Sequence, residues 1–187
     1  MIRPVGRAEQ ASLGDFFAGL SVESRYRRFF APVRPSHGLL DLLAGVPAHV
    51  DAIVAVADGV IVGHAMAADL PERVYPCDGR ATDVGVVVAD AWQRKGLGAA
   101  LMRALIARAQ ARGVTVLAMD VLPGNRRVLA MILGHWPDAV VGHSPDGLDI
   151  RITLPPARPP RTAPRPDAAT ARPPARGQVR PLVPVGG

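Results

Sequence analysis

Two cations and two glycines occur together at residues 94–98, in the run Arg-Lys-Gly-Leu-Gly, and they suit the binding of an anion. The segment that follows, residues 99–112, places Leu101 and Leu105 on one row, as in an amphipathic helix. The first backbone N–H groups of a helix have no internal partner, and the helix dipole is positive there. We therefore predict that a phosphate group binds at this turn, where glycines let the backbone approach closely. The alternative is a tight strand-to-helix connection with two exposed cations.

The residues before this turn favour a buried strand, because four of the six residues 83–88 are valines. Strand, glycine turn and helix also occur in dinucleotide-binding folds, but the spacing here differs from their fingerprint. Seven residues separate Val88 from Gly96, and Leu101 takes the place of the third glycine. A phosphate-binding loop of the Gly-Lys-Ser/Thr type is excluded as well, because that run does not occur.

The rest of the pattern predicts a mixed α/β fold with an antiparallel front half and one βαβ crossover. Asp58-Gly59 is a strong hairpin signal, and residues 145–147 carry a second one. Ser21 and Ser36 are suited to cap helices. We expect strands at residues 2–5, 50–57, 60–68, 83–88, 114–120, 140–143 and 148–154. We expect helices at residues 8–19, 22–30, 36–43, 99–112 and 126–133.

Several stretches resemble the GNAT superfamily of N-acetyltransferases. The family pattern Gln/Arg-x-x-Gly-x-Gly/Ala is matched by residues 93–98 after a valine-rich strand, and residues 122–130 resemble the second motif, in which an Asn opens a helix. Residues 2–5 and 21–30 are similar to modules of bacterial protein lysine acetyltransferases. The resemblance covers residues 1–154. It implies a mostly antiparallel central sheet of six to seven strands with flanking helices.

The resemblance also implies a site for acetyl-CoA. Pantetheine would lie beside the central strand and accept backbone hydrogen bonds there, pyrophosphate would bind at the glycine turn, and a backbone N–H near Val87 or Val88 would face the thioester oxygen. The residues so implied in coenzyme binding are Val86, Val87, Val88, Gln93, Arg94, Lys95, Gly96, Leu97, Gly98, Ala99 and Asn125.

By the same likeness Asp83 is the candidate catalytic base, since some relatives carry a glutamate at this place in the strand. A base is useful because a lysine-type amine, with a pKa of about 10.4, must lose a proton before it attacks. A solvated or paired carboxylate is the alternative for Asp83, and Glu72 is a weaker candidate base. Many relatives protonate the departing thiolate with a tyrosine that residues 126–136 lack, where His135 is the alternative donor.

The run at residues 25–30, Arg-Tyr-Arg-Arg-Phe-Phe, belongs to the second expected helix. We expect Tyr26 and the two phenylalanines to pack against the protein and the three arginines to lie in solvent. The other interpretation is that Tyr26 and its neighbouring arginines line the acceptor side of the site.

The amino-acid composition changes after residue 154 and predicts a domain boundary there. The chain has 187 residues and a net charge of +6, but residues 155–187 hold six arginines, one aspartate and ten prolines. That segment is too poor in large apolar residues to form a core, so we predict a Pro/Arg-rich disordered tail after a domain at residues 1–154. Cys77 is the only cysteine, which excludes an internal disulfide. The histidines show no metal-ligand spacing, so we expect no metal.

The start of the chain lacks a signal peptide, and no apolar run is long enough to cross a bilayer, so we expect a cytoplasmic protein that does not bind membranes. The predicted function is acetyl transfer from acetyl-CoA to a primary amine, either a small molecule or a protein lysine. A non-catalytic acyl-CoA-sensing or scaffold protein is the alternative. Nucleic acid is expected as a partner only through the basic tail. A homodimer is compatible with this interpretation.

Overall fold

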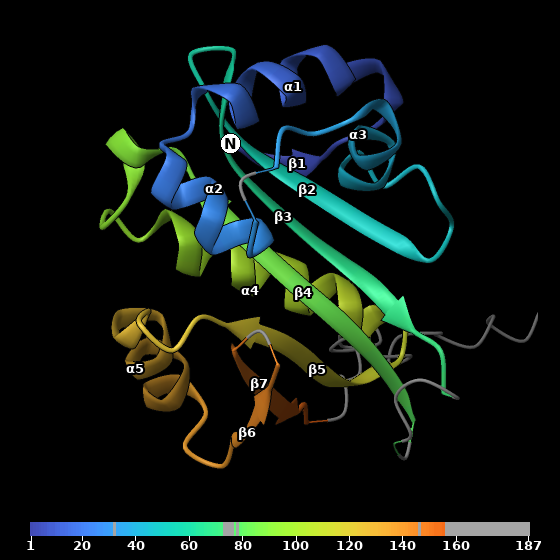
Figure 1. Cartoon of the computed structure of the whole chain (residues 1–187). Helices are drawn as coiled ribbons and strands as arrows, with labels where there is room; N and C mark the ends of the chain where they lie inside the picture. Colours follow the sequence, from blue (N-terminus) through green and yellow to red (C-terminus); the bar gives the residue numbers. More distant parts are fainter. Residues whose placement is uncertain (32, 73–76, 78, 146, 156–187) are drawn as a thin grey trace, which may run out of the picture. The chain divides into compact units, whose positions relative to one another are not determined.

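The computed structural model describes residues 1–31, 33–72, 77, 79–145 and 147–155 (Figure 1). From residue 156 onward, the predicted tail lies outside the described residues. One open sheet of seven strands forms the centre, in the order β1-β2-β3-β4-β5-β7-β6. The strands are β1 (Ile2–Pro4), β2 (Val50–Ala57), β3 (Val60–Leu70), β4 (Arg80–Val88), β5 (Val114–Val121), β6 (Val140–Ser144) and β7 (Gly147–Thr153).

All neighbouring strands pair antiparallel except β4 and β5, which run parallel and are joined by a helix. The predicted mixed α/β fold with one βαβ crossover is therefore confirmed. The α-helices are α1 (Gln10–Gly19), α2 (Val22–Phe29), α3 (His37–Leu43), α4 (Leu97–Ala111) and α5 (Arg126–His135). Two short 3-10 turns, η1 (Arg7–Glu9) and η2 (Asp90–Trp92), precede α1 and the turn before α4.

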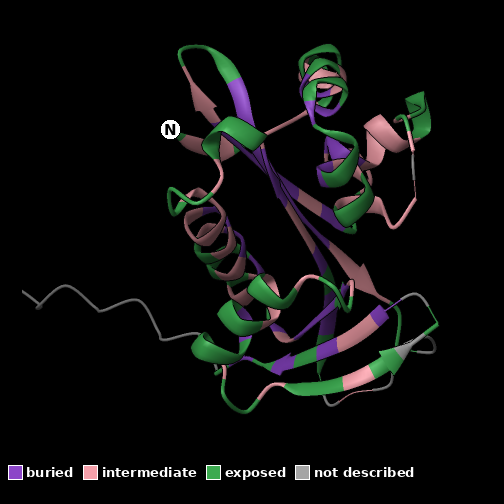
Figure 2. Ribbon diagram, turned by 60° about the vertical axis from the view of Figure 1, so that its left-hand side comes forward, coloured by how far each residue is buried: buried purple, intermediate pink, exposed green. Residues whose placement is uncertain are grey.

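The two faces of the sheet carry separate hydrophobic cores. On one face Leu13 and Phe17 of α1 and Leu43 of α3 pack with Met66 and Val87 of the sheet. On the other face, α4 and α5 pack on the sheet through a second cluster, which includes Leu101, Leu105, Ile132, Val84 and Val88. In Figure 2 the buried residues follow the strands, and most exposed residues lie on helices and loops.

Local signals in the sequence explain several element ends. The Ser21 and Ser36 hydroxyls each accept a hydrogen bond from a backbone N–H in the first turn of their helix, as predicted. In the hairpin between β2 and β3, Asp58 and Gly59 have φ values of 48° and 77°, as a type I′ turn requires. The expected boundaries that differ by more than one residue are the starts of α1, β4 and α4, which lie at Gln10, Arg80 and Leu97, and the ends of β3 and α5, which lie at Leu70 and His135.

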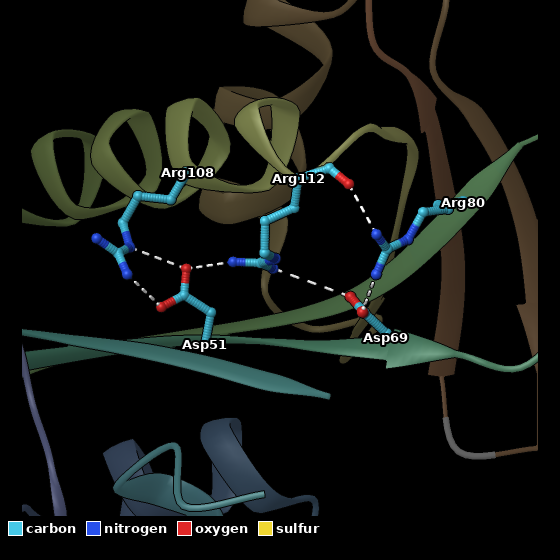
Figure 3. Close-up of polar contacts among 5 residues, drawn as sticks. All are labelled: Asp51, Asp69, Arg80, Arg108 and Arg112. Carbon is cyan, nitrogen blue, oxygen red and sulfur yellow. Dashed lines mark hydrogen bonds and ion pairs between the residues drawn. The ribbon is translucent and has the colours of Figure 1, made fainter. Parts of the chain in front are cut away.

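A network of charged side chains fixes the C-terminal end of α4 to the sheet (Figure 3). Arg108 donates two hydrogen bonds of 2.8 Å to Asp51, and Arg112 donates to the same carboxylate. Asp69 accepts from Arg80 at 2.6 Å, and Arg80 also donates to the carbonyl of Arg112 at 2.8 Å. The network holds β2, β3, β4 and α4 together at the end of the sheet where β4 and β5 are paired.

Candidate functional site

Strands β4 and β5 pair at one end and separate at the other. Their register runs from Arg80 opposite Val114 to Asp83 opposite Ala118, and no further pair joins the two strands in the part of the chain that the structure describes. Beyond that point β4 still pairs with β3 as far as Val88, and β5 with β7 as far as Val121. Residues 84–88 therefore present one edge of β4 to the space between the diverging strands.

The backbone groups on that edge belong to alternate residues. The N–H of Ala89 donates to Val62 of β3, so the polar groups of Val88 point away from β3, and those of Val86 and Val84 follow by alternation. The carbonyl of Val88 is engaged, because Gln93 Nε2 donates to it at 3.1 Å. Val87, also predicted to bind the coenzyme, has its polar backbone groups on the β3 side, and its side chain packs in the α1 and α3 core.

The predicted anion-binding turn lies at the N-terminus of α4. Gly96 is the N-cap residue with a φ of 81°, a conformation that favours glycine. A Cβ added to Gly96 would have no atom within 4 Å, and one added to Gly98 would meet only Val88 Cγ2 at 3.8 Å. Gly96 is therefore required by its backbone conformation, whereas nothing in the described structure requires Gly98 to lack a side chain.

Cations surround this turn. Lys95 lies over the indole ring of Trp92, with its Nζ 5.4 Å from the ring centroid. A hollow of about 430 Å³ lies outside the first turn of α4, and Lys95 and Arg103 contribute to its wall. The turn thus combines the free N–H groups of a helix start with positive side chains, which suits a phosphate group. The remaining predicted residues of the turn, Arg94, Leu97 and Ala99, lie at the same helix start.

The side chain of Gln93 connects the turn before α4 to β4 and to α2 by hydrogen bonds. In addition to Val88, its Nε2 donates to the hydroxyl of Ser24 in α2 at 3.0 Å. Asp90 accepts from the hydroxyls of Ser24 and Ser21 at 2.7 and 2.8 Å and from the N–H of Ser21 at 2.9 Å. Burial opposes the ionisation of Asp90, but these hydrogen bonds outweigh it and lower its pKa. The turn before α4 and the first turn of α2 therefore form one hydrogen-bonded unit.

Asn125 lies at the start of α5, as the second motif implied. Its backbone carbonyl accepts from the N–H of Leu129 at 3.1 Å, but its side chain makes no cap hydrogen bond. His135 lies at the other end of α5, is exposed, and its Nδ1 is 3.2 Å from the carbonyl oxygen of Met131. Glu72 is exposed as well.

Asp83 projects from β4 on the face covered by α1, α2 and α3, at the point where β4 and β5 begin to separate. Its side chain keeps an exposed surface, yet the surrounding protein raises the pKa of this carboxyl. Burial is the main cause; the negative charge of Asp120 on β5 adds to it, and the positive charge of Arg28 opposes it. A carboxylate with a raised pKa accepts protons more readily, which suits a catalytic base.

Arg28 of α2 lies directly against β4, although we expected it in solvent. A Cβ added to Gly85 would come within 2.5 Å of the guanidinium carbon of Arg28, so a side chain at this position would displace the guanidinium from where it lies. Arg27, by contrast, is exposed and paired with Glu23. The expectation that all three arginines lie in solvent is therefore wrong for Arg28, and the second interpretation, in which these arginines line the acceptor side, stays a prediction.

His64 is fully buried on the same face of the sheet. Its Nε2 is 2.8 Å from the carbonyl oxygen of Leu43, and its ring packs edge-on against Phe17. Burial and the nearby charge of Arg28 lower its pKa to about 3. His64 is therefore neutral at physiological pH and serves the core.

Sequence reasoning missed the roles of Ser24, Gly85, Arg28 and Asp90. A signal for one contact was present, because a glycine inside a valine-rich strand often marks the close approach of another group.

Among the described residues, no three His, Cys, Asp or Glu side chains lie close enough together to hold a metal ion. None of the described helices combines the length and apolar character needed to cross a membrane.

A comparison with protein families matches residues 19–134 to the acetyltransferase (GNAT) family. The chain belongs to this GNAT family. The resemblance deduced from residues 93–98 and 122–130 is thereby confirmed, and with it the general class of acyltransferase. No match to a curated protein sequence was found.

Solved structures share the GNAT fold. The GNAT domain of PAT from S. lividans is 25% identical, with a TM-score of 0.68 over 82% of this chain and 89% of that one. A GNAT superfamily phosphinothricin acetyltransferase from Sinorhizobium meliloti, solved with AcCoA, is 16% identical, with a TM-score of 0.63 over 82% of this chain and 88% of the other. A cAMP-binding acyltransferase from Mycobacterium smegmatis is 23% identical with a TM-score of 0.52; the match covers 87% of this GNAT chain but 46% of the larger protein.

Proposed function

We propose that this GNAT protein transfers an acetyl group from acetyl-CoA to a primary amine. One observation carries the proposal: the free edge of β4 lies between a cationic helix start and a carboxylate whose pKa is raised. The first end suits a phosphate-bearing coenzyme, and the second suits an amine that must lose a proton.

The residues of the site fit acetyl-CoA. Pyrophosphate would receive hydrogen bonds from the N–H groups of residues 96–99, with Arg94 and Lys95 adding positive charge. The backbone groups of Val86 and the N–H of Val88 are directed toward the space where pantetheine would lie, and the Asn125 amide is not used for capping. Acetyl-CoA would supply an acetyl group activated as a thioester.

Asp83 and the backbone N–H of Val88 have separate roles in the proposed reaction. Asp83 accepts the proton that the acceptor ammonium must lose, directly or through one water molecule. The Val88 N–H donates to the thioester oxygen, where negative charge increases as the amine nitrogen bonds to the carbonyl carbon. The carbon–sulfur bond breaks, the new amide nitrogen loses its second proton to water, and the departing thiolate takes up a proton from water. A thiol with a pKa of about 8.5 is a tolerable leaving group without a dedicated acid.

The direct test is release of free CoA thiol from acetyl-CoA in the presence of small amines, blocked lysine peptides and proteins. We expect release that depends on the acceptor and falls strongly in an Asp83→Asn variant. Coenzyme binding without acceptor-dependent release by any member of the panel would rule out the enzyme.

A non-catalytic acyl-CoA-binding protein is the second candidate. It is favoured by the absence of a tyrosine from residues 126–136 and by the position of His135, at the far end of α5 from Asn125. This alternative predicts thermal stabilisation by acetyl-CoA with no turnover, and the same panel distinguishes it from the enzyme.

A further inference from the structure

The guanidinium of Arg28 lies against Gly85, on the face of β4 that also carries the Asp83 side chain, with part of its hydrogen-bonding capacity unused. Its Nε is buried and has no hydrogen-bond partner. In the part of the chain that the structure describes, no carboxylate oxygen lies within the 4.0 Å of an ion pair with it. A partly buried cation without a bonded anion is unfavourable, and the Arg28 guanidinium occupies the space that Gly85 leaves open.

Among the described residues, none of the neighbours of Arg28 is an anion in contact with its guanidinium. Its guanidinium carbon is 5.1 Å from the centroid of the Phe29 ring, a contact with an aromatic face. The ring of buried His64 is neutral and gives no counter-charge. Asp83 attracts Arg28 electrostatically, but the two groups are not in contact.

Opposite charges are therefore arranged side by side on one face of the sheet. Asp83 and Gly85 are alternate residues of β4, so their positions on this face are about 7 Å apart. Asp120 of β5 adds negative charge on the Asp83 side, and Arg28 supplies positive charge over Gly85. A molecule with an ammonium and a carboxylate a few bonds apart would complement these charges, with its ammonium near Asp83 and its carboxylate near Arg28.

We propose that Arg28 binds a carboxylate of the acceptor, which makes the substrate a small amino acid whose amine faces Asp83. The inference rests on the proposed acetyltransferase function and narrows its acceptor class. Arg28 would bind the carboxylate through parallel N–H donors, the geometry in which guanidinium and carboxylate match best. The carboxylate would also provide the anion that Arg28 lacks.

The test compares amino acids with their carboxamides at saturating acetyl-CoA, using the full chain. We expect kcat/KM to be roughly 10- to 100-fold higher for the carboxylate forms, the usual range for a charged hydrogen bond. An Arg28→Met variant should reduce this ratio to near one, because kcat/KM falls for the carboxylates relative to the carboxamides, and Arg28→Lys should restore part of the ratio. Arg27→Met, a change to the exposed neighbour, should leave the ratio unchanged.

Equal kcat/KM for carboxylate and carboxamide in the unmodified protein would overturn the inference, and that comparison needs no variant. A blocked lysine peptide acetylated faster than any free amino acid would overturn it as well. Calorimetric titration with N-acetyl amino acids and their amides separates the two proposals. Carboxylate-selective binding without turnover would contradict the enzyme alone, whereas turnover without selectivity would contradict the role of Arg28 alone.

Discussion

Asp90 accepts hydrogen bonds from both the backbone N–H and the hydroxyl of Ser21, at 2.9 and 2.8 Å. Ser21 is the N-cap residue of α2, and Asp90 begins η2, just before the turn that leads into α4. The helix that carries Arg28 is thus attached to the turn proposed to hold pyrophosphate. Displacement of either one should disturb the other.

Replacing Asp90 with alanine should weaken binding of the coenzyme at the turn before α4 and binding of the acceptor near Arg28. The change removes the acceptor for two hydroxyls and one N–H, a loss of about 1–2 kcal/mol, or roughly tenfold in coenzyme affinity. Calorimetric titration with CoA, together with KM for the acceptor, measures both effects. Asp15→Ala, an exposed substitution on α1, is the control. Unchanged CoA affinity in Asp90→Ala would show that the hydrogen bonds between α2 and η2 do not support coenzyme binding.

Gly96 and Gly98 should respond differently to alanine. Gly96→Ala forces a side chain into a left-handed conformation, so we expect a loss of about 1–2 kcal/mol in the free energy of unfolding. Gly98→Ala lies in the first turn of α4 with ordinary contacts, so stability should be equal or higher. Its CoA affinity should nevertheless fall, because the new methyl group keeps phosphate away from the backbone.

Urea denaturation and CoA titration of the two variants separate these effects. Full CoA affinity in a stable Gly98→Ala protein would argue against a phosphate site at this helix start.

Asp83→Asn should lower activity and raise stability. A folded-state pKa above the unfolded value favours the folded protein at low pH, and this advantage is lost as pH rises through the folded pKa. At pH 7 the ionised carboxylate is therefore unfavourable to folding, and a neutral amide should raise Tm. Near pH 3, where Asp83 is protonated in both states, the two Tm values should converge.

The activity of Asp83→Asn should fall about 10²- to 10⁴-fold if Asp83 is the base. Asp83→Glu, which keeps a carboxylate, should recover part of it. A variant that loses stability at pH 7 but keeps full turnover would contradict both the raised pKa of the Asp83 carboxyl and its role as the base.

Asp51→Asn should destabilise the fold through the network of Figure 3. Asp51, whose side chain is 13% exposed, loses its pairing with Arg108 and Arg112, so the free energy of unfolding should fall by about 2–4 kcal/mol. Glu23→Gln, which breaks the exposed pair with Arg27, should change it by less than about 0.5 kcal/mol. Equal effects of the two substitutions would contradict a structural role for the network.

The pH dependence gives a second readout for Asp51. Burial opposes its ionisation, but hydrogen bonds and charge from Arg108 and the charge of Arg112 outweigh this and lower its pKa. The stabilisation is therefore present above the unfolded pKa and is lost as pH falls through the folded one. The difference in Tm between Asp51→Asn and the unmodified protein should shrink from pH 7 to pH 3.

The sequence was most informative where a local rule determines the structure. Asp58-Gly59 predicted its hairpin because positive φ at two successive positions restricts the residues allowed. Ser21 and Ser36 predicted helix starts because their hydroxyls accept from nearby N–H groups. The end of α5 was missed because Gly134 is tolerated inside a helix despite its low propensity.

The contacts that α2 makes with the sheet and with η2 could not be deduced in the same way. Arg28 and Gly85 are far apart in the sequence, and nothing near Arg28 distinguishes it from Arg27, which is exposed. Asp90 and Ser24 are likewise brought together only by the packing of α2 on the sheet. Such long-range contacts depend on the relative placement of whole elements, which hydrophobic periodicity does not specify.

The separation of β4 from β5 gives this protein a free strand edge inside its sheet as well as at its borders. Border strands are often protected against pairing with another chain by proline or charge, and β1 carries Pro4. Residues 84–88 contain neither, and both would disturb an edge that we propose binds the extended pantetheine of the coenzyme. In concentrated solution without a ligand, this inner edge is the place where association between copies of the protein should begin.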